Sequence, residues 1–393
     1  MTSIGTQGPL SVFVPREIKP QEQRVALTPD LCVELVQAGS PVAVQAGAGR
    51  FAGHTDDDYR SAGAEIVEDA RAGFARADLV IKVKEPLAEE YGLLRRGQLL
   101  FTFLHLAASR ALTEALLQTG ASALAYETLV DERGQLPLLT PMSEVAGRLS
   151  VQEGARHLLG TTGGRGVLLG GVPGTRPGVV LVIGAGVVGT EAARMAAGLG
   201  AEVVLMDRDL GRLRQLALEL PANVCLLYSD TGTLRRELAR ADLVIGAVLL
   251  RGALAPRLVS RADLALMKAG SVIVDVAVDQ GGVTETTRPT SHAEPTYVVD
   301  GIIHYAVPNM PGAVPRTSTE ALVHATTPYI RLLARHGLDS AVRDDARLLS
   351  ALNVYAGQVT EPAVAQTFAL PYVPPKVALE RAAAAAHPPA PPS

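Results

Sequence analysis

The stretch from Val179 to Asp207 constrains the fold of this chain more than any other part of its sequence. Residues 179–183 are five apolar residues and predict a strand buried on both faces, and residues 190–199 predict a helix rich in alanine. The turn between them has the pattern GxGxxG. Its first glycine permits a tight turn, the second lets the backbone approach a pyrophosphate, and the third lets the helix pack close to the strand. These three residues are Gly184, Gly186 and Gly189.

An acidic residue ends the next predicted strand, residues 202–206, at Asp207. An acid at this place can bond the ribose hydroxyls of NAD, and it repels the 2′-phosphate of NADP. The neighbouring Arg208 leaves NADP as an alternative cofactor, but the acid favours NAD. Because strand, turn, helix, second strand and acid all agree, the segment predicts a Rossmann-type NAD domain rather than an ordinary tight turn.

Length and charge bound the remaining possibilities. A chain of 393 residues is long enough for two domains, and a net charge of −4 gives no indication of a nucleic-acid or membrane-surface partner. No apolar run has the length of a membrane span, and the first residues lack the pattern of a signal peptide. The two cysteines, Cys32 and Cys225, lie far apart in sequence. We therefore expect no disulfide and a cytoplasmic location.

Apolar runs alternate with helical patterns before residue 137, which predicts a second parallel sheet covered by helices and without a GxGxxG of its own. The expected strands are residues 12–14, 42–45, 79–84, 99–104 and 123–126, and the clearest helices are residues 30–38 and 109–119.

The NAD domain is expected to begin with a long helix over residues 138–160 and to contain about six strands. Those strands are residues 179–183, 202–206, 224–227, 243–248, 272–278 and 297–299. Helical patterns follow at residues 319–326, 329–336 and 341–356. Such a tail cannot extend the nucleotide sheet, so we expect it to pack on the first domain.

The predicted fold is therefore α/β, with two doubly wound parallel-sheet domains and a cleft between them. We expect a substrate domain over residues 1–137, an NAD domain over 138–315, and a part over 316–393 that returns to the substrate domain. Its alanine- and proline-rich end, from about residue 382, is expected to be disordered.

Four polar side chains follow predicted strands, where open α/β sheets bind ligands. Arg24 can offer a bidentate fork to a carboxylate, or it is a solvated surface arginine. Lys84 shares a strand face with Lys82, and either residue can equally be an edge-strand lysine. His105 can donate to a carbonyl or move a proton, unless it is structural. Asp279, which follows the in-strand Asp275, is a possible proton acceptor or a turn residue.

Several segments together resemble the alanine dehydrogenases, which are related to the α-subunit of proton-translocating transhydrogenase. The resemblance covers about residues 11 to 340 and rests on these stretches: VPREIKPQEQRVALTP, IKVKEP, FTFLHLAASR, PMSEVAGRLSVQEGARHL, GGRGVLLGGVPG, VLVIGAGVVG, ADLVIGAV, VDVAVDQGG and VPNMPGAVPRTST. It implies the reversible oxidative deamination of L-alanine to pyruvate and ammonia with NAD.

The resemblance also implies roles for single residues. Arg24 and Lys84 would bind the carboxylate and carbonyl region of the substrate, and His105 and Asp279 would be the catalytic pair. The remaining residues that it implies are Ser143, Asp207 and Ser229 for NAD and Asn309 lining the cleft.

The family is typically a homohexamer, and some members hold a divalent ion between a glutamate and a histidine. Here His336 fits that histidine, but Leu332 occupies the glutamate position, so we expect no metal.

Three other functions stay open at this point. One is a transhydrogenase-like NAD-binding subunit, and the second is a dehydrogenase acting on another small amino acid. The third is an NAD-responsive binding protein without catalysis. The sequence does not decide between alanine and serine or glycine, the size of the assembly, or the direction of the reaction in the cell.

Overall fold

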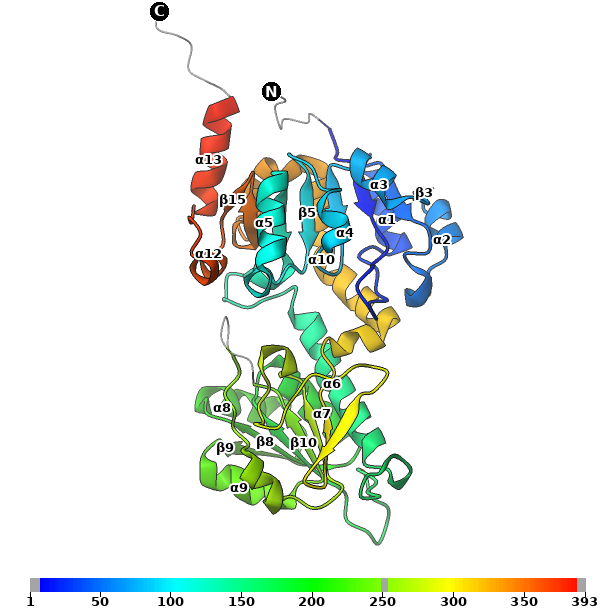
Figure 1. Ribbon diagram of the computed structural model, residues 1–393. Coiled ribbons are helices and arrows are strands. Elements are labelled where there is room, and N and C mark those ends of the chain that lie inside the picture. Colours follow the sequence, from blue (N-terminus) through cyan, green and yellow to red (C-terminus); the bar gives the residue numbers. More distant parts are fainter. Residues whose placement is uncertain (1–7, 249–253, 387–393) are drawn as a thin grey trace, which may run out of the picture. The chain divides into compact units, whose positions relative to one another are not determined.

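The computed structural model describes residues 8–248 and 254–386, and the chain divides into two units. The first unit joins the residues up to Pro141 with those from Val314 onward, and the second is Met142–Ala313. Each unit contains one sheet with helices packed against it (Figure 1). The α/β class with two domains is therefore confirmed.

Over the residues that the structure describes, the sheet of the first unit has eight strands in the order β15-β14-β6-β5-β4-β1-β2-β3. The strands from β3 to β6 run parallel, and β14 and β15 join antiparallel at the β6 edge. Their bounds are Val12–Val14 for β1, Val42–Gln45 for β2, Glu65–Val67 for β3, Leu79–Ile81 for β4, Leu99–Thr102 for β5, Ser122–Ala125 for β6, Leu352–Tyr355 for β14 and Gln358–Val359 for β15.

The last two strands correct the prediction of a helix over residues 341–356. The long helix α10 (Pro315–Asp344) ends before that segment, a short α11 (Leu348–Ala351) follows, and β14 pairs with β6. Leu352 and Val354 are fully buried. An open edge of a sheet offers unpaired backbone groups, and pairing with it outweighed the weak helical pattern.

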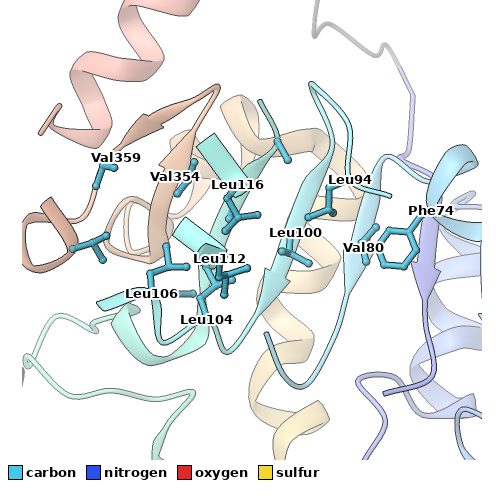
Figure 2. Close-up of a cluster of buried hydrophobic side chains, with 14 of the residues drawn as sticks. Phe74, Val80, Leu94, Leu100, Leu104, Leu106, Leu112, Leu116, Val354 and Val359 are labelled. Carbon is cyan, nitrogen blue, oxygen red and sulfur yellow. The ribbon is translucent and has the colours of Figure 1, made fainter. Parts of the chain in front are cut away.

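A cluster of buried apolar side chains shows how the two ends of the chain share one core (Figure 2). Val80 and Leu100 come from the central strands and Leu112 from α5, while Val354 and Val359 come from β14 and β15. The segment after Val314 thus supplies part of the core of the first unit, which removes apolar surface from water on both partners.

The helices of the first unit connect its parallel strands or follow its last ones. Several have a side-chain cap: Thr28 accepts at the start of α1, and Thr55 and Asp58 form a capping box at the start of α2. Their bounds are α1 Pro29–Gln37, α2 Asp56–Ser61, α3 Ala70–Arg76, α4 Ala88–Tyr91, α5 Arg110–Thr119, α12 Pro362–Phe368 and α13 Pro375–Ala386, with short 3-10 turns η1 Arg50–Ala52, η2 Leu106–Ala108 and η3 Tyr126–Thr128.

Helix α13 differs from the expectation of disorder from about residue 382, because it continues to Ala386. Residues 387–393 lie outside the described part. Among the described residues, no helix combines the length and the apolar character that crossing a bilayer requires.

In the described part of the second unit, the sheet has seven strands in the order β12-β13-β11-β10-β7-β8-β9. All neighbours are parallel except β12 and β13. The bounds are β7 Val179–Ile183, β8 Glu202–Asp207, β9 Val224–Tyr228, β10 Leu243–Gly246, β11 Val272–Asp275, β12 Thr296–Val299 and β13 Ile302–Tyr305. The sequence prediction missed β13, which is the sixth parallel strand, and β12 is an antiparallel edge strand instead.

Among the described residues of this unit, four helices accompany the sheet: α6 Thr140–His157, α7 Val187–Gly198, α8 Leu210–Glu219 and α9 Thr231–Arg240. The 3-10 turns of the second unit are η4 Gly160–Thr162, η5 Arg261–Leu266, η6 Val278–Gln280 and η7 Met310–Ala313. Helix α6 packs closely on α7, because a β-carbon on Gly147 would lie 2.3 Å from the carbonyl oxygen of Val188. Small residues on both helices make this approach possible.

The third glycine of the turn sets the distance between α7 and β7. A β-carbon on Gly189 would lie 1.8 Å from the carbonyl oxygen of Gly184. We expect Gly189→Ala to destabilise the second unit by about 1–3 kcal/mol or more, because a backbone oxygen cannot move aside cheaply. Gly186→Ala is the matched control, since a β-carbon there meets nothing within 4 Å. Scanning calorimetry measures both, and equal unfolding midpoints for the two variants would contradict this account.

Candidate active site

The glycine turn of the second unit offers backbone amides to a ligand. Gly184 has φ 105°, and a β-carbon there would lie 2.7 Å from the carbonyl oxygen of Ala247. Gly186 is the N-cap of α7 and makes no side-chain cap, while open space surrounds the position of its missing β-carbon. The N-terminus of a helix with unpaired amides and no side chain in front of it is suited to a phosphate group.

Asp207 lies beside this turn at the end of β8. One carboxylate oxygen accepts the N–H of Ala185 at 2.6 Å, and the other accepts the N–H of Asp209 at 2.9 Å. The N–H of Ser229 donates to the backbone oxygen of Asp207 at 2.9 Å. The structure thus brings Asp207, Ser229 and the glycine turn together. The remaining lone pairs of the carboxylate can accept ribose hydroxyls.

Arg212, in the first turns of α8, is a neighbour of this turn that sequence reasoning missed. Its guanidinium donates to the carbonyl oxygen of Ala185 at 3.1 Å and to the hydroxyl of Thr190 at 3.1 Å. Ser143 is half-buried on α6, one turn before Gly147. Residues four apart share a helix face, so Ser143 lies on the side of α6 that packs against α7.

A loop after β11 carries Asp279, which is exposed in the turn η6. The N–H of Asn309 donates to Asp279 Oδ2 at 3.4 Å, and Asn309 has φ 54°, so these two predicted residues are neighbours. Asp275 closes the same loop. Its carboxylate accepts from the N–H of Val283 at 2.8 Å and the hydroxyl of Thr287 at 2.5 Å, and burial raises its pKa. Asp275 is therefore a structural residue, whereas Asp279 lies in the exposed turn after the strand.

Arg24 of the first unit is 2% exposed, so its interpretation as a solvated arginine is wrong. Glu22 holds the guanidinium in a bidentate pair, with Nε–Oε1 at 2.7 Å and Nη2–Oε2 at 2.5 Å. A buried pair of this kind fixes the plane of the guanidinium.

Lys84 lies near this pair, with Nζ 5.8 Å from the centroid of the Phe103 ring. Burial lowers the pKa of Lys84, and the positive charges of Arg24 and Lys19 lower it further. The Phe103 ring also stacks on the His105 ring at 5.8 Å between centroids. Phe103, which sequence reasoning did not select, thus joins Lys84 and His105 in one cluster that Arg24 influences electrostatically.

Lys82 differs from Lys84, although the strand pattern predicted one face for both. Strand β4 ends at Ile81, so strand alternation does not extend to either lysine. Lys82 is 1% exposed and pairs with Glu90 at 2.8 Å and with Glu17 at 3.3 Å. It therefore belongs to the interior.

His105 follows β5 and is exposed, with a left-handed backbone at φ 49°. This conformation is uncommon for a residue with a β-carbon. Glu127 Oε1 accepts the N–H of His105 at 2.5 Å and that of Leu104 at 3.2 Å. A carboxylate therefore stabilises the turn that carries the imidazole.

Within residues 8–248 and 254–386, no group of three or more His, Cys, Asp or Glu side chains is placed to hold a metal ion. His336 has Asp344 as an ionic neighbour, with Nε2 and Oδ2 3.9 Å apart.

The strand order β9-β8-β7-β10-β11-β13 with a glycine turn after the central strand β7 defines the second unit as a dinucleotide-binding α/β domain. Comparison with known proteins gives the family. Residues 13–146 match the family model "Alanine dehydrogenase/PNT, N-terminal domain", and residues 150–362 match "Alanine dehydrogenase/PNT, C-terminal domain". The chain therefore belongs to the alanine dehydrogenase/PNT family.

Individual proteins agree with this assignment. The alanine dehydrogenase of Halomonas elongata is 52% identical over 364 residues, which cover 93% of this chain and 98% of the relative. A solved L-alanine dehydrogenase has 53% identity and a TM-score of 0.89, covering 91% of this chain and 99% of the other. A transhydrogenase from Sinorhizobium meliloti has 26% identity and a TM-score of 0.76, covering 90% and 99%.

We expect Glu127→Ala to loosen the turn at His105, because two amides lose their acceptor. Hydrogen exchange of the amides of residues 104 and 105 should accelerate by on the order of tenfold, as measured by mass spectrometry. Glu127→Gln retains a carbonyl oxygen and should change exchange less. Glu132→Ala removes an exposed carboxylate nearby in sequence and is the control. Unchanged exchange in Glu127→Ala would show that this bond does not hold the turn.

Proposed function

We propose that this chain is an alanine dehydrogenase that catalyses the reversible, NAD-dependent oxidative deamination of L-alanine to pyruvate and ammonia. The observation that carries the proposal is identity of about one half to alanine dehydrogenases over nine-tenths of the chain, together with the cluster of Arg24, Lys84 and His105. Family membership alone includes transhydrogenases, so the cationic cluster is the additional support for amino-acid chemistry.

In this proposal the two units divide the work. Residues 1–137 and 316–393 form the substrate domain, and residues 138–315 form the NAD domain. The glycine turn supports this division, because it lies in the second unit, and so does the cluster of cations in the first unit.

The proposed NAD site uses the turn of Gly184, Gly186 and Gly189 for the pyrophosphate. Asp207 accepts the ribose hydroxyls, and Ser229 and Ser143 complete the site. Its fit rests on the open space at Gly186 and on the free lone pairs of Asp207. When bound, NAD supplies the acceptor for a hydride, so the protein itself need only bind, orient and move protons.

The substrate carboxylate binds to Arg24 and Lys84 in this mechanism. The buried pair with Glu22 holds the Arg24 guanidinium in one plane, and burial of Lys84 strengthens its attraction for an anion. Fixing the carboxylate also fixes the α-carbon, which makes the reaction effectively unimolecular. Positive charge near the carbonyl oxygen stabilises negative charge that develops there.

His105 and Asp279 transfer the protons. One group must accept protons from the amino group and from the attacking water, and both side chains are exposed in loops that follow interior strands, β5 for His105 and β11 for Asp279. Asn309 contacts Asp279 through its N–H and so orients it. The division of the individual proton transfers between these two residues stays open in the proposal.

We also propose a homo-oligomer, a hexamer as the family resemblance implies, and a cytoplasmic location. The location is supported by the absence of a disulfide at Cys32 and Cys225, both of which are free.

The first test is NAD reduction by the isolated chain with a panel of small L-amino acids, repeated with NADP. We expect saturable activity with NAD that is highest for L-alanine. A stronger response to another amino acid would assign a neighbouring dehydrogenase. NAD-induced thermal stabilisation without turnover would instead indicate a transhydrogenase-like subunit or a binding protein.

We expect His105→Ala and Asp279→Ala each to lose most turnover, by about 100-fold or more, because a missing proton-transfer group is worth that much. Both should keep NAD affinity, measured by calorimetric titration. Gly186→Ala is the converse control, because its new methyl group fills the space in front of α7 and should weaken NAD binding while the fold persists. Wild-type kcat in both of the first two variants would disprove the assignment.

Carboxylate binding should weaken as the pH rises, because Lys84 attracts an anion only while it is protonated. Burial lowers its pKa from 10.5, so the loss should begin below that pH. The measurement is the inhibition constant of oxamate, an unreactive analogue of pyruvate, from about pH 7 to about pH 10. Lys84→Arg stays charged over this range and should abolish the dependence. The same pH dependence in Lys84→Arg would assign it to another group.

A further inference from the structure

Three charged side chains form a buried group beneath the segment that carries Lys84. The ammonium of Lys82 lies 3.3 Å from Glu17 Oε2 and 2.8 Å from Glu90 Oε1. The side chains of Glu17, Lys82 and Glu90 are 3%, 0% and 6% exposed. We call these three residues the buried triad.

Stability alone gives little reason for such a group. Three charges leave water to form it, and well-packed apolar residues of similar volume are often as stable as a buried ion pair. The triad also carries two negative charges against one positive charge. Burial raises the pKa of Glu17, which reflects the free-energy cost of removing its charge from water. The arrangement therefore has to be explained by what else its members bind.

Both carboxylates also bind the backbone of the segment after β4. Glu17 Oε1 accepts the N–H of Val83 at 2.6 Å and that of Lys84 at 3.4 Å. Glu90 Oε2 accepts the N–H of Leu87 at 3.0 Å. Lys82 links the two carboxylates, so the segment from residue 83 to residue 87 is held near both of its ends.

The carbonyl group of Lys84 is held as well. The hydroxyl of Thr102, on β5, donates to the Lys84 carbonyl oxygen at 3.0 Å, and Thr102 is fully buried. The N–H and the C=O of Lys84 therefore both have buried side-chain partners, although the segment belongs to no helix or strand. These bonds limit the positions that Nζ can take over the Phe103 ring.

We propose that the buried triad is a positioning device for substrate binding: Glu17 and Glu90, joined by Lys82, fix the backbone of Lys84 so that its ammonium meets the substrate carboxylate. This inference rests on the proposed role of Lys84. It adds Glu17, Lys82 and Glu90 as positioning residues, and Thr102 assists them from β5.

The test compares Glu17→Ala with Glu17→Gln. Glu17→Ala removes the acceptor of the Val83 N–H and should raise the KM for pyruvate by on the order of tenfold, while the KM for NADH is unchanged. Glu17→Gln keeps a carbonyl oxygen for that N–H and should restore most of the affinity. A merely structural role would lower the unfolding midpoint of Glu17→Ala without this selective change in KM.

A milder pair keeps the test decisive if Glu17→Ala fails to fold. Thr102→Val removes one hydroxyl at nearly constant volume and should raise the pyruvate KM severalfold, and Thr102→Ser should restore it. Thr326→Val is the matched control, because the hydroxyl of buried Thr326 donates to the backbone carbonyl of Val323 within helix α10 of the same unit. It should leave both KM values unchanged.

The outcomes separate this inference from the proposed function. Turnover of alanine by the unmutated protein, together with loss of pyruvate binding in the Lys84→Met variant, supports the role of Lys84. Suppose that those two results hold but Glu17→Ala keeps the wild-type pyruvate KM. The inference about the buried triad is then overturned, while the proposed function stands. Thr102→Val takes the place of Glu17→Ala in this comparison if Glu17→Ala does not fold. If Lys84→Met binds pyruvate normally, the role of Lys84 fails and the inference fails with it.

Discussion

The structure depends on carboxylates that accept backbone N–H groups at the carboxyl ends of parallel strands. Where a strand ends, its amides lose their ladder partners, and a buried amide without a partner is costly. Four acids satisfy amides at these points: Glu17, Glu127, Asp207 and Asp275. A charged acceptor makes a stronger bond than a neutral one, so each acid converts an irregular loop into a defined one.

These same loops carry the groups assigned to the chemistry. The segment under Glu17 presents Lys84, the turn under Glu127 presents His105, and the loop closed by Asp275 presents Asp279. A side chain that acts on a substrate must be accessible to it, and its position must also be fixed. A buried acid that anchors the backbone, while the neighbouring side chain keeps its polar group accessible, meets both demands for the residues proposed to act.

Much of the fold was predictable because it follows from local patterns. Buried parallel strands are continuous apolar runs, and helices between them carry recognisable caps, so nearly all central strands were placed correctly. The errors lie in the outer strands of the two sheets. The edge strands β3 and β15 were missed, as was β13, which is second from an edge, and β14, also second from an edge, was taken for helix. Such strands depend more on the partner with which they pair than on their own residues. The residues 352–355 do not themselves indicate that β6 has an open edge with which they can pair.

The glycine turn and Asp207 could be recognised from the sequence alone, and so could the residues proposed for the site, because these depend on short spacings and on what each side chain can do. The surroundings of these residues follow from the packing of the whole chain: Arg24 is buried against Glu22, Lys82 is fully buried while Lys84 is half-buried, and Phe103 joins Lys84 to His105. Glu17 and the amide of Val83 are 66 residues apart, so no local pattern links them. Such contacts exist only once the strands are side by side.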